Sequence, residues 1–341
     1  MKTVGLTVAT ILLMPLVPLW LEGQQAAGGG QSGAQKVEDD AGQPIQVDVD
    51  VVNLYCSVRD KKNALIPSLE KADFNLAEDG TKQTIKYFTR ETDLPLTIGL
   101  LVDVSGSQQN LIETERRAAT SFFSSVLKKK DVAFLISFGA DSELLQDTTG
   151  SPRSLQDGLS RLKLNAGFSG INAGPVPTAT HNRGTVLYDA VYLAAHDMLS
   201  KEVGRKAIVL ITDGQDEGSD LSENAAIEAA QKADSIIYGI LYVDRQVYGG
   251  GFGGLAGGYS GEGVLKHMAE ETGGRMFQVD RKNSLDSIFD QIQQEMRSQY
   301  AIGYTPTNSR KDGSFRKIDL RTSSKDLKVQ VRKGYYALPP Q

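Results

Sequence analysis

Cysteine, histidine and long basic runs are scarce in this chain. Of its 341 residues, one is cysteine and three are histidine. A single cysteine, Cys56, excludes a disulfide within the chain, and its place in an alternating apolar stretch favours a buried thiol over a reactive one. The histidines do not have the HExxH spacing of a zinc protease and offer no obvious partners for a nucleophilic serine. They are His181, His196 and His267.

Positive charge is also limited. The formal net charge is −5, and the densest basic cluster is Lys128–Lys130. This cluster ends a predicted helix, where cations interact favourably with the helix dipole. We therefore expect no nucleic-acid partner, and no motif indicates a small-molecule substrate.

The N-terminal segment has the pattern of a secretory signal peptide. Lys2 precedes an almost uncharged apolar run, and Pro15 and Pro18 argue against a straight spanning helix. Residues 1–23 are the predicted signal and residues 24–44, rich in Gly, Gln and Ala, a flexible linker. An uncleaved membrane anchor is the alternative. We expect export, and the pattern does not distinguish the periplasm, the cell surface and the medium.

One stretch, LTIGLLVDVSGS at Leu96–Ser107, joins a predicted strand to a group of oxygen donors. Its continuous apolar run is typical of a parallel strand covered on both faces. Asp103, Ser105 and Ser107 follow in the pattern D-x-S-x-S. Ligands of α/β sheets bind beyond the carboxyl ends of the strands, and hard oxygen donors suit Mg²⁺ or Ca²⁺.

Two later segments extend this pattern. GTVLYD at Gly184–Asp189 places Thr185 at the start of a predicted helix, and AIVLITDG at Ala207–Gly214 is a second apolar strand that ends in Asp213. The order of these residues, with separations of roughly 80 and then 28 residues, resembles the metal-ion-dependent adhesion site of von Willebrand factor type A (vWA) domains. This resemblance covers about Leu94–Gln299, and the flanks also resemble the secreted vWA-related proteins common in acidobacteria.

The resemblance implies a role for each site residue. Ser105 and Ser107 would bind the metal directly, Thr185 directly or through water, and Asp103 and Asp213 mostly through waters. The expected cofactor is Mg²⁺, with Mn²⁺ or Ca²⁺ possible in its place. A cation held by neutral hydroxyls would take an Asp or Glu of a partner protein as its remaining ligand. The implied function is a metal-dependent adhesion or protein-binding module and not an enzyme.

Two other functions compete with this one. A metal-dependent hydrolase would need a general base, for which Asp189 and Asp216 are candidates by position, although a helix N-terminus and a solvated turn explain them equally well. A structural scaffold without bound metal is the second alternative.

Neighbouring strands would also place Asp103 opposite Asp213. Without metal, this like-charge pair would raise a carboxylate pKa.

A glycine-rich loop at residues 248–263 should flank the site. It does not join a strand tightly to a helix, so we reject a dinucleotide-binding role. The loop offers three apolar or aromatic side chains that could contact a partner: Phe252, Leu255 and Tyr259.

The expected fold class is α/β, with a doubly wound, mostly parallel, vWA/Rossmann-like sheet at residues 93–299. Residues 45–92 and 300–338 have β patterns, and each flank is too small for its own core. We expect both flanks to form one small β-sandwich of about six strands, into which the α/β domain is inserted. Asp79-Gly80 predicts a hairpin whose return strand includes Ile85, Tyr87 and Phe88.

Expected elements complete this scheme. Strands are expected at Val132–Phe138, Glu143–Gln146, Ser235–Val243 and Arg275–Val279, and helices at Leu111–Lys129, Ser154–Leu162, Leu187–Leu199, Asn224–Lys232, Glu262–Thr272 and Leu285–Arg297.

Overall fold

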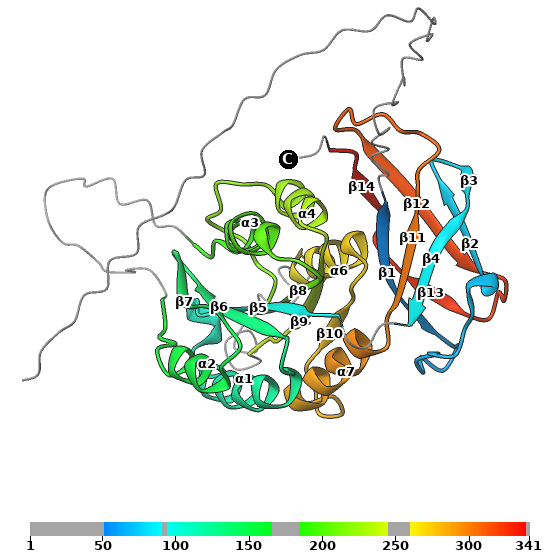
Figure 1. Cartoon of the computed structure of the whole chain (residues 1–341). Helices are drawn as coiled ribbons and strands as arrows, with labels where there is room; N and C mark the ends of the chain where they lie inside the picture. Colours follow the sequence, from blue (N-terminus) through cyan, green and yellow to red (C-terminus); the bar gives the residue numbers. More distant parts are fainter. Residues whose placement is uncertain (1–50, 91–93, 166–183, 245–259, 339–341) are drawn as a thin grey trace, which may run out of the picture. The chain divides into compact units, whose positions relative to one another are not determined.

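A computed structural model describes residues 51–90, 94–165, 184–244 and 260–338 (Figure 1). Its α/β part contains a six-stranded sheet in the order β10–β9–β8–β5–β6–β7. Five strands are parallel, and β7 pairs with β6 antiparallel at one edge. The strands are β5 (Leu96–Asp103), β6 (Val132–Phe138), β7 (Ser142–Thr149), β8 (Arg205–Thr212), β9 (Ser235–Leu241) and β10 (Met276–Gln278).

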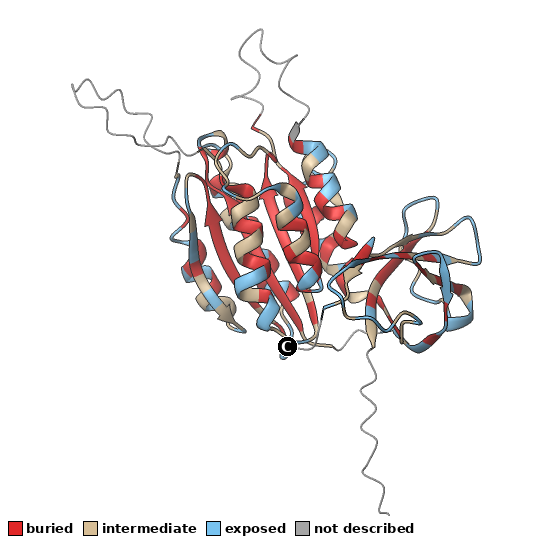
Figure 2. Ribbon diagram, turned by 90° about the horizontal axis from the view of Figure 1, so that it is seen from above, coloured by how far each residue is buried: buried red, intermediate tan, exposed pale blue. Residues whose placement is uncertain are grey.

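Helices cover both faces of this sheet, which is why the central strands are apolar without alternation (Figures 1 and 2). All eight residues of β5 are buried. Leu100 packs in the core beneath α1, α2 and α7, whereas Leu101 packs on the opposite side beneath α3, α4 and α6. The helices are α1 (Ile112–Val126), α2 (Pro152–Leu159), α3 (Leu187–Tyr192), α4 (Glu223–Lys232), α6 (Ser260–Thr272) and α7 (Leu285–Arg297). The doubly wound sheet is therefore confirmed.

Two helices differ most from their predicted bounds. The helix expected at 154–162 begins earlier, because Ser151 caps it by accepting a hydrogen bond from the Ser154 amide (3.3 Å) and Pro152 occupies the first turn. The helix expected at 187–199 changes after α3 into a wide π-helical turn, η3 (Leu193–Met198), and a 3-10 turn, η4 (Leu199–Lys201).

The two flanks form two four-stranded antiparallel sheets, β13–β1–β11–β4 and β14–β12–β2–β3. Both sheets contribute to one apolar core, which includes Leu54 of β1, Leu76 of β2, Ile302 of β11 and Leu320 of β12. The predicted shared sandwich is confirmed. Its elements are β1 (Val52–Arg59), η1 (Lys71–Asp73), β2 (Phe74–Glu78), β3 (Thr81–Gln83), β4 (Ile85–Arg90), β11 (Tyr300–Tyr304), β12 (Phe315–Thr322), β13 (Lys328–Gln330) and β14 (Gly334–Tyr336).

The predicted return strand of the first hairpin is wrong. The turn at Asp79-Gly80 forms with positive φ at both residues, but β3 is the strand that pairs with β2. Ile85 starts β4, which crosses to the other sheet and pairs with β11 over five positions, compared with three between β2 and β3. The longer ladder explains the crossing, and the described residues form eight strands instead of about six. Val47 and Val49, at the start of the β pattern predicted for residues 45–92, lie outside the described residues.

A buried ionic cluster joins α7 to the sandwich. The Glu295 carboxylate, fully buried, accepts hydrogen bonds from Ser57 of β1 (3.2 Å) and Gln330 of β13 (3.1 Å). It also forms ion pairs with Arg59 and with Arg275 (3.0 Å). Four donors therefore compensate one buried charge.

Within the described residues, no helix combines the length and apolar character needed to cross a membrane.

Candidate metal centre

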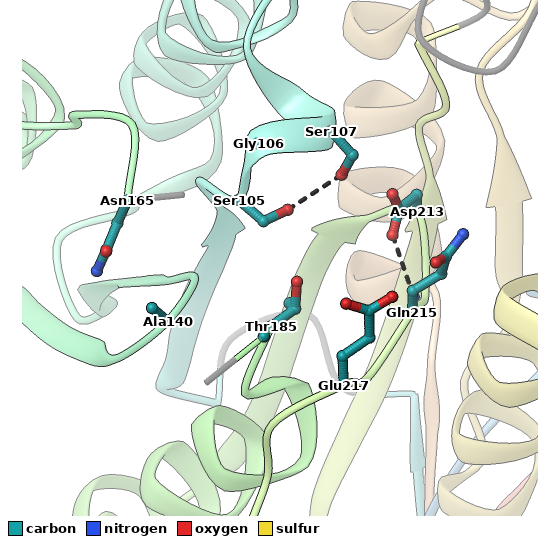
Figure 3. A pocket seen from close by; sticks show the side chains of 10 residues that line it. Ser105, Gly106, Ser107, Ala140, Asn165, Thr185, Asp213, Gln215 and Glu217 are labelled. Carbon is teal, nitrogen blue, oxygen red and sulfur yellow. Dashed lines mark hydrogen bonds between the residues drawn. The ribbon is translucent and has the colours of Figure 1, made fainter. Parts of the chain in front are cut away.

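The site lies where two neighbouring parallel strands end (Figure 3). β5 pairs with β8 through residues 96–102 and 205–211, so Asp103, at the end of β5, and Asp213, just after β8, reach the same edge of the sheet. The prediction that these strands are neighbours is confirmed. This edge is the usual location of ligand sites in α/β sheets.

Asp103 is fully buried behind the site and links the two strands. One carboxylate oxygen accepts a hydrogen bond from the Ser105 amide (2.9 Å), and the other accepts one from the Thr212 hydroxyl (2.5 Å). Burial raises the pKa of Asp103 from 3.8 to about 6, although hydrogen bonds from Ser105 and Thr212 oppose the shift. The Asp213 charge contributes in the predicted direction, but it is the smallest cause. Removal from water is therefore the dominant reason for the shift.

The two serine hydroxyls come from the turn that Asp103 fixes. Ser105 precedes a 3-10 turn, η2 (Gly106–Gln108), which contains Ser107. The Ser105 and Ser107 hydroxyl oxygens are 3.0 Å apart. Two neutral oxygen donors are thus held side by side at the end of β5.

Thr185 approaches from the start of α3. The Val186 amide donates to the Gly139 carbonyl (2.9 Å), and the Thr185 carbonyl accepts from the Glu217 (3.0 Å) and Gly218 (3.1 Å) amides. The peptide unit that follows the Thr185 side chain is therefore held at both its carbonyl and its amide. Figure 3 shows the Thr185 hydroxyl facing the serine side of the pocket.

Asp213 lies in a tight turn that requires glycine. Its carboxylate accepts a hydrogen bond from the Gln215 amide (3.1 Å). Gly214 between them has φ 79°, and a Cβ there would lie 2.4 Å from the Gly261 carbonyl oxygen. A side chain at this position would be strained by its backbone conformation and would collide with main chain.

These residues surround an open pocket of about 160 Å³. Four of the five predicted site residues line it, whereas Asp103 is not in the lining and is hydrogen-bonded to Ser105 and Thr212. Three further polar side chains line the pocket and were not predicted as site residues. The TDGQDEG segment around Asp213 contains two of them and could have indicated their presence. The three are Asn165, Gln215 and Glu217.

The carboxylates considered as general bases have structural roles. Asp216 accepts hydrogen bonds from the Tyr188 amide (3.3 Å) and the Ser219 hydroxyl (2.5 Å). Asp189 accepts from the Asp220 and Leu221 amides, both at 3.0 Å. Both residues tie the loop after β8 to the start of α3, and neither lines the pocket.

Other predicted features fall outside or away from this pocket. Phe252, Leu255 and Tyr259 lie outside the described residues. Within the described part of the chain, no group of three or more His, Cys, Asp or Glu side chains could hold a metal ion.

Comparison with known proteins agrees with the fold. Residues 98–215 match the family model of the von Willebrand factor type A domain. This match lies within the α/β part of the chain. No curated protein matches the chain.

Several solved structures resemble the chain. An aerotolerance-related membrane protein from Bacteroides fragilis is 19% identical, with a TM-score of 0.41, over 60% of this chain and 98% of that one. The vWF domain of the type V pili tip protein Mfa5 from Porphyromonas gingivalis is 13% identical, with a TM-score of 0.42, over 60% and 95%. Proximal thread matrix protein 1 from the mussel byssus, with a zinc-occupied MIDAS motif, is 13% identical, with a TM-score of 0.45, over 63% and 48%.

Proposed function

We propose that this vWA domain is a protein-binding module that captures an acidic side chain of a partner through a divalent cation. Ser105 and Ser107 would bind the cation directly, and Thr185 directly or through water. Asp103 and Asp213 would act mostly through waters. The observation that carries the proposal is the pair of serine hydroxyls, 3.0 Å apart, on the wall of an open pocket at the sheet edge.

The donor set fits a hard divalent cation, and Mg²⁺ is the one that we propose. Octahedral Mg²⁺ takes oxygen ligands at about 2.1 Å, so two neighbouring ligands at right angles are about 3.0 Å apart. The Ser105 and Ser107 oxygens have this separation. Ca²⁺ takes its oxygens at about 2.3–2.6 Å, often in a pentagonal bipyramid whose neighbouring equatorial ligands are also about 3 Å apart, so this spacing suits both ions. Mn²⁺ also prefers hard oxygen ligands and is a useful probe.

The chain's own residues would organise capture of a partner. Neutral hydroxyls leave most of the charge of a divalent cation uncompensated, and Asp103 is held back by its two hydrogen bonds. When bound, the cation supplies positive charge and an open position for a carboxylate. The opening of the pocket gives a partner's Asp or Glu access to that position. We propose this adhesion-type binding without a catalytic step, because Asp189 and Asp216 have other partners.

The first test is metal binding. Titration calorimetry with Mg²⁺ and Mn²⁺ should show binding at or below millimolar metal, weakened by Ser105→Ala. Ser124→Ala, on the exposed side of α1, is the matched control and should leave affinity unchanged. Absence of binding by the wild type would favour a structural scaffold without metal.

The second test is partner capture. Wild-type protein should retain a protein from envelope or extracellular fractions in Mg²⁺ and release it in EDTA, whereas Asp103→Ala should not retain it. Equal capture by Asp103→Ala would contradict the proposal. Metal-dependent turnover in a substrate screen would favour the hydrolase instead.

We also propose that the protein is exported, on the pattern of residues 1–23. N-terminal sequencing of the protein from its native host should find a mature end at about residues 23–27. An intact Met1 would favour an uncleaved membrane anchor or a cytoplasmic location.

A further inference from the structure

Glu217 is a carboxylate in the pocket that the proposed ligand set does not use. It lines the same pocket as Ser105, Ser107 and Thr185, and it is exposed. Among the described residues, no side chain forms an ion pair with it. Figure 3 shows its carboxylate directed toward the Thr185 hydroxyl and the Asp213 side of the pocket.

The main chain holds Glu217 in this position. Its amide donates to the Thr185 carbonyl (3.0 Å), as does the Gly218 amide (3.1 Å). Gly184 allows the close approach, because a Cβ there would lie 2.3 Å from the Glu217 Cβ and 3.0 Å from Oε2. The side chain therefore folds over Gly184 and Thr185 instead of extending away from the pocket.

The charges of the pocket indicate that a bound cation would attract the Glu217 carboxylate. The hydroxyl donors are neutral, Asp103 is already hydrogen-bonded on both oxygens, and Asp213 accepts from Gln215. A divalent cation in the pocket would attract any further carboxylate within reach. A carboxylate tethered to the same chain has an effective concentration of about millimolar or more, which favours it over a dilute partner.

We infer that Glu217 is a resident carboxylate ligand that competes with the partner's acidic side chain for the cation. This inference rests on the proposed function, because it assumes a cation held by Ser105 and Ser107. A partner would then bind by displacing the Glu217 carboxylate from the cation. Carboxylates that bind the cation weakly are therefore excluded, and a partner is retained only when it makes additional contacts with the protein.

The test uses Mn²⁺ as the metal and acetate as the carboxylate. Glu217→Gln keeps the length of the side chain and removes its charge. Asp220→Asn makes the same chemical change on an exposed residue of the same loop that does not line the pocket, and serves as the control. Free Mn²⁺ is measured by electron paramagnetic resonance, and water bound to the metal by water-proton relaxation.

Glu217→Gln should weaken Mn²⁺ binding about tenfold and leave one more water on the bound metal. Acetate should then displace that water at about a tenfold lower concentration than in the wild type, because the tethered competitor is gone. Asp220→Asn should behave as the wild type does.

Two failures are distinguishable. If the wild type binds no Mn²⁺, the proposed function is wrong and the inference falls with it. If the wild type and Glu217→Gln carry the same number of waters and respond equally to acetate, Glu217 is no ligand, and the proposed function stands without it. A loss of affinity with an unchanged water count also overturns the inference, since it would show attraction at a distance only.

Discussion

Asp103 is the residue whose position has the clearest energetic cost. Its pKa of about 6 in the folded protein exceeds the ordinary 3.8, so the folded protein holds a proton that the unfolded chain has already lost between these values. The free energy of unfolding must therefore fall as pH rises through this window, by about 3 kcal/mol for the full shift. At pH values well below 4 the carboxyl is protonated in both states, so its ionisation no longer makes the free energy of unfolding depend on pH.

Asp103→Asn should remove this pH dependence. In EDTA, the stability of the variant relative to the wild type should increase between pH 4 and pH 6 and then stay level, because the amide does not ionise. Urea unfolding at each pH measures the difference. A constant difference from pH 4 to pH 7 would contradict the assigned pKa.

Ionisation of Glu115 of α1 also has a free-energy cost, because this carboxyl is buried and the charge of Asp103 acts on it. It is fully buried, and neither of its carboxylate oxygens has a hydrogen-bond partner among the described residues. Burial, followed by the Asp103 charge, raises the pKa of Glu115 well above its ordinary value. The unfolded chain loses this proton at lower pH than the folded protein, so the penalty grows as pH rises.

Glu115→Gln should therefore be more stable than the wild type, by a margin that widens from pH 4 to pH 8. Glu113→Gln on the exposed side of the same helix is the control, and its margin should stay within about 0.5 kcal/mol. Thermal unfolding in EDTA across this range checks both variants. A margin for Glu115→Gln that narrows with pH would show that the carboxyl is not buried in this way.

At the scale of elements, α7 and the sandwich share one buried charge. Glu295→Ala would leave Arg59 and Arg275 without their anion in a largely buried environment, and breaking such a pair costs about 3–5 kcal/mol. Asp290→Asn, on the exposed side of α7, should change stability by less than about 0.5 kcal/mol. Denaturant unfolding of both variants gives the comparison. Equal stability of the two variants would show that the cluster does not contribute to folding.

The elements also show where sequence patterns were sufficient. Leu96–Asp103 is apolar without alternation because helices cover both faces, and that pattern alone predicted a central parallel strand. The return strand after Asp79-Gly80 was predicted wrongly, because β3 and β4 are one continuous pattern in sequence. Only the presence of β11, more than 200 residues later, separates them into two sheets.

At the scale of the whole molecule, the C-terminal flank completes both sheets of the sandwich. β11 lies between β1 and β4, and β12 lies between β14 and β2. Truncation after Gln299 should leave β1, β2 and β4 without β11 and β12, the strands they pair with, and the amides of residues 52–90 should lose protection from hydrogen exchange. Truncation after Lys333, which removes only the edge strand β14, should preserve most of that protection. Persistent protection after the longer truncation would contradict the shared core.

The sequence by itself determined the alternation of strands and helices, the apolar central strands and the D-x-S-x-S, Thr and Asp order, because each is a local pattern of residue types. The tertiary structure decided which groups the side-chain oxygens of the site residues contact. Asp103 lies behind the pocket because both of its oxygens accept hydrogen bonds, one of them from β8. Glu217 enters the pocket because its amide donates to Thr185, 32 positions away in sequence. No local pattern specifies such contacts, since they depend on which segments the folded sheet brings to one edge.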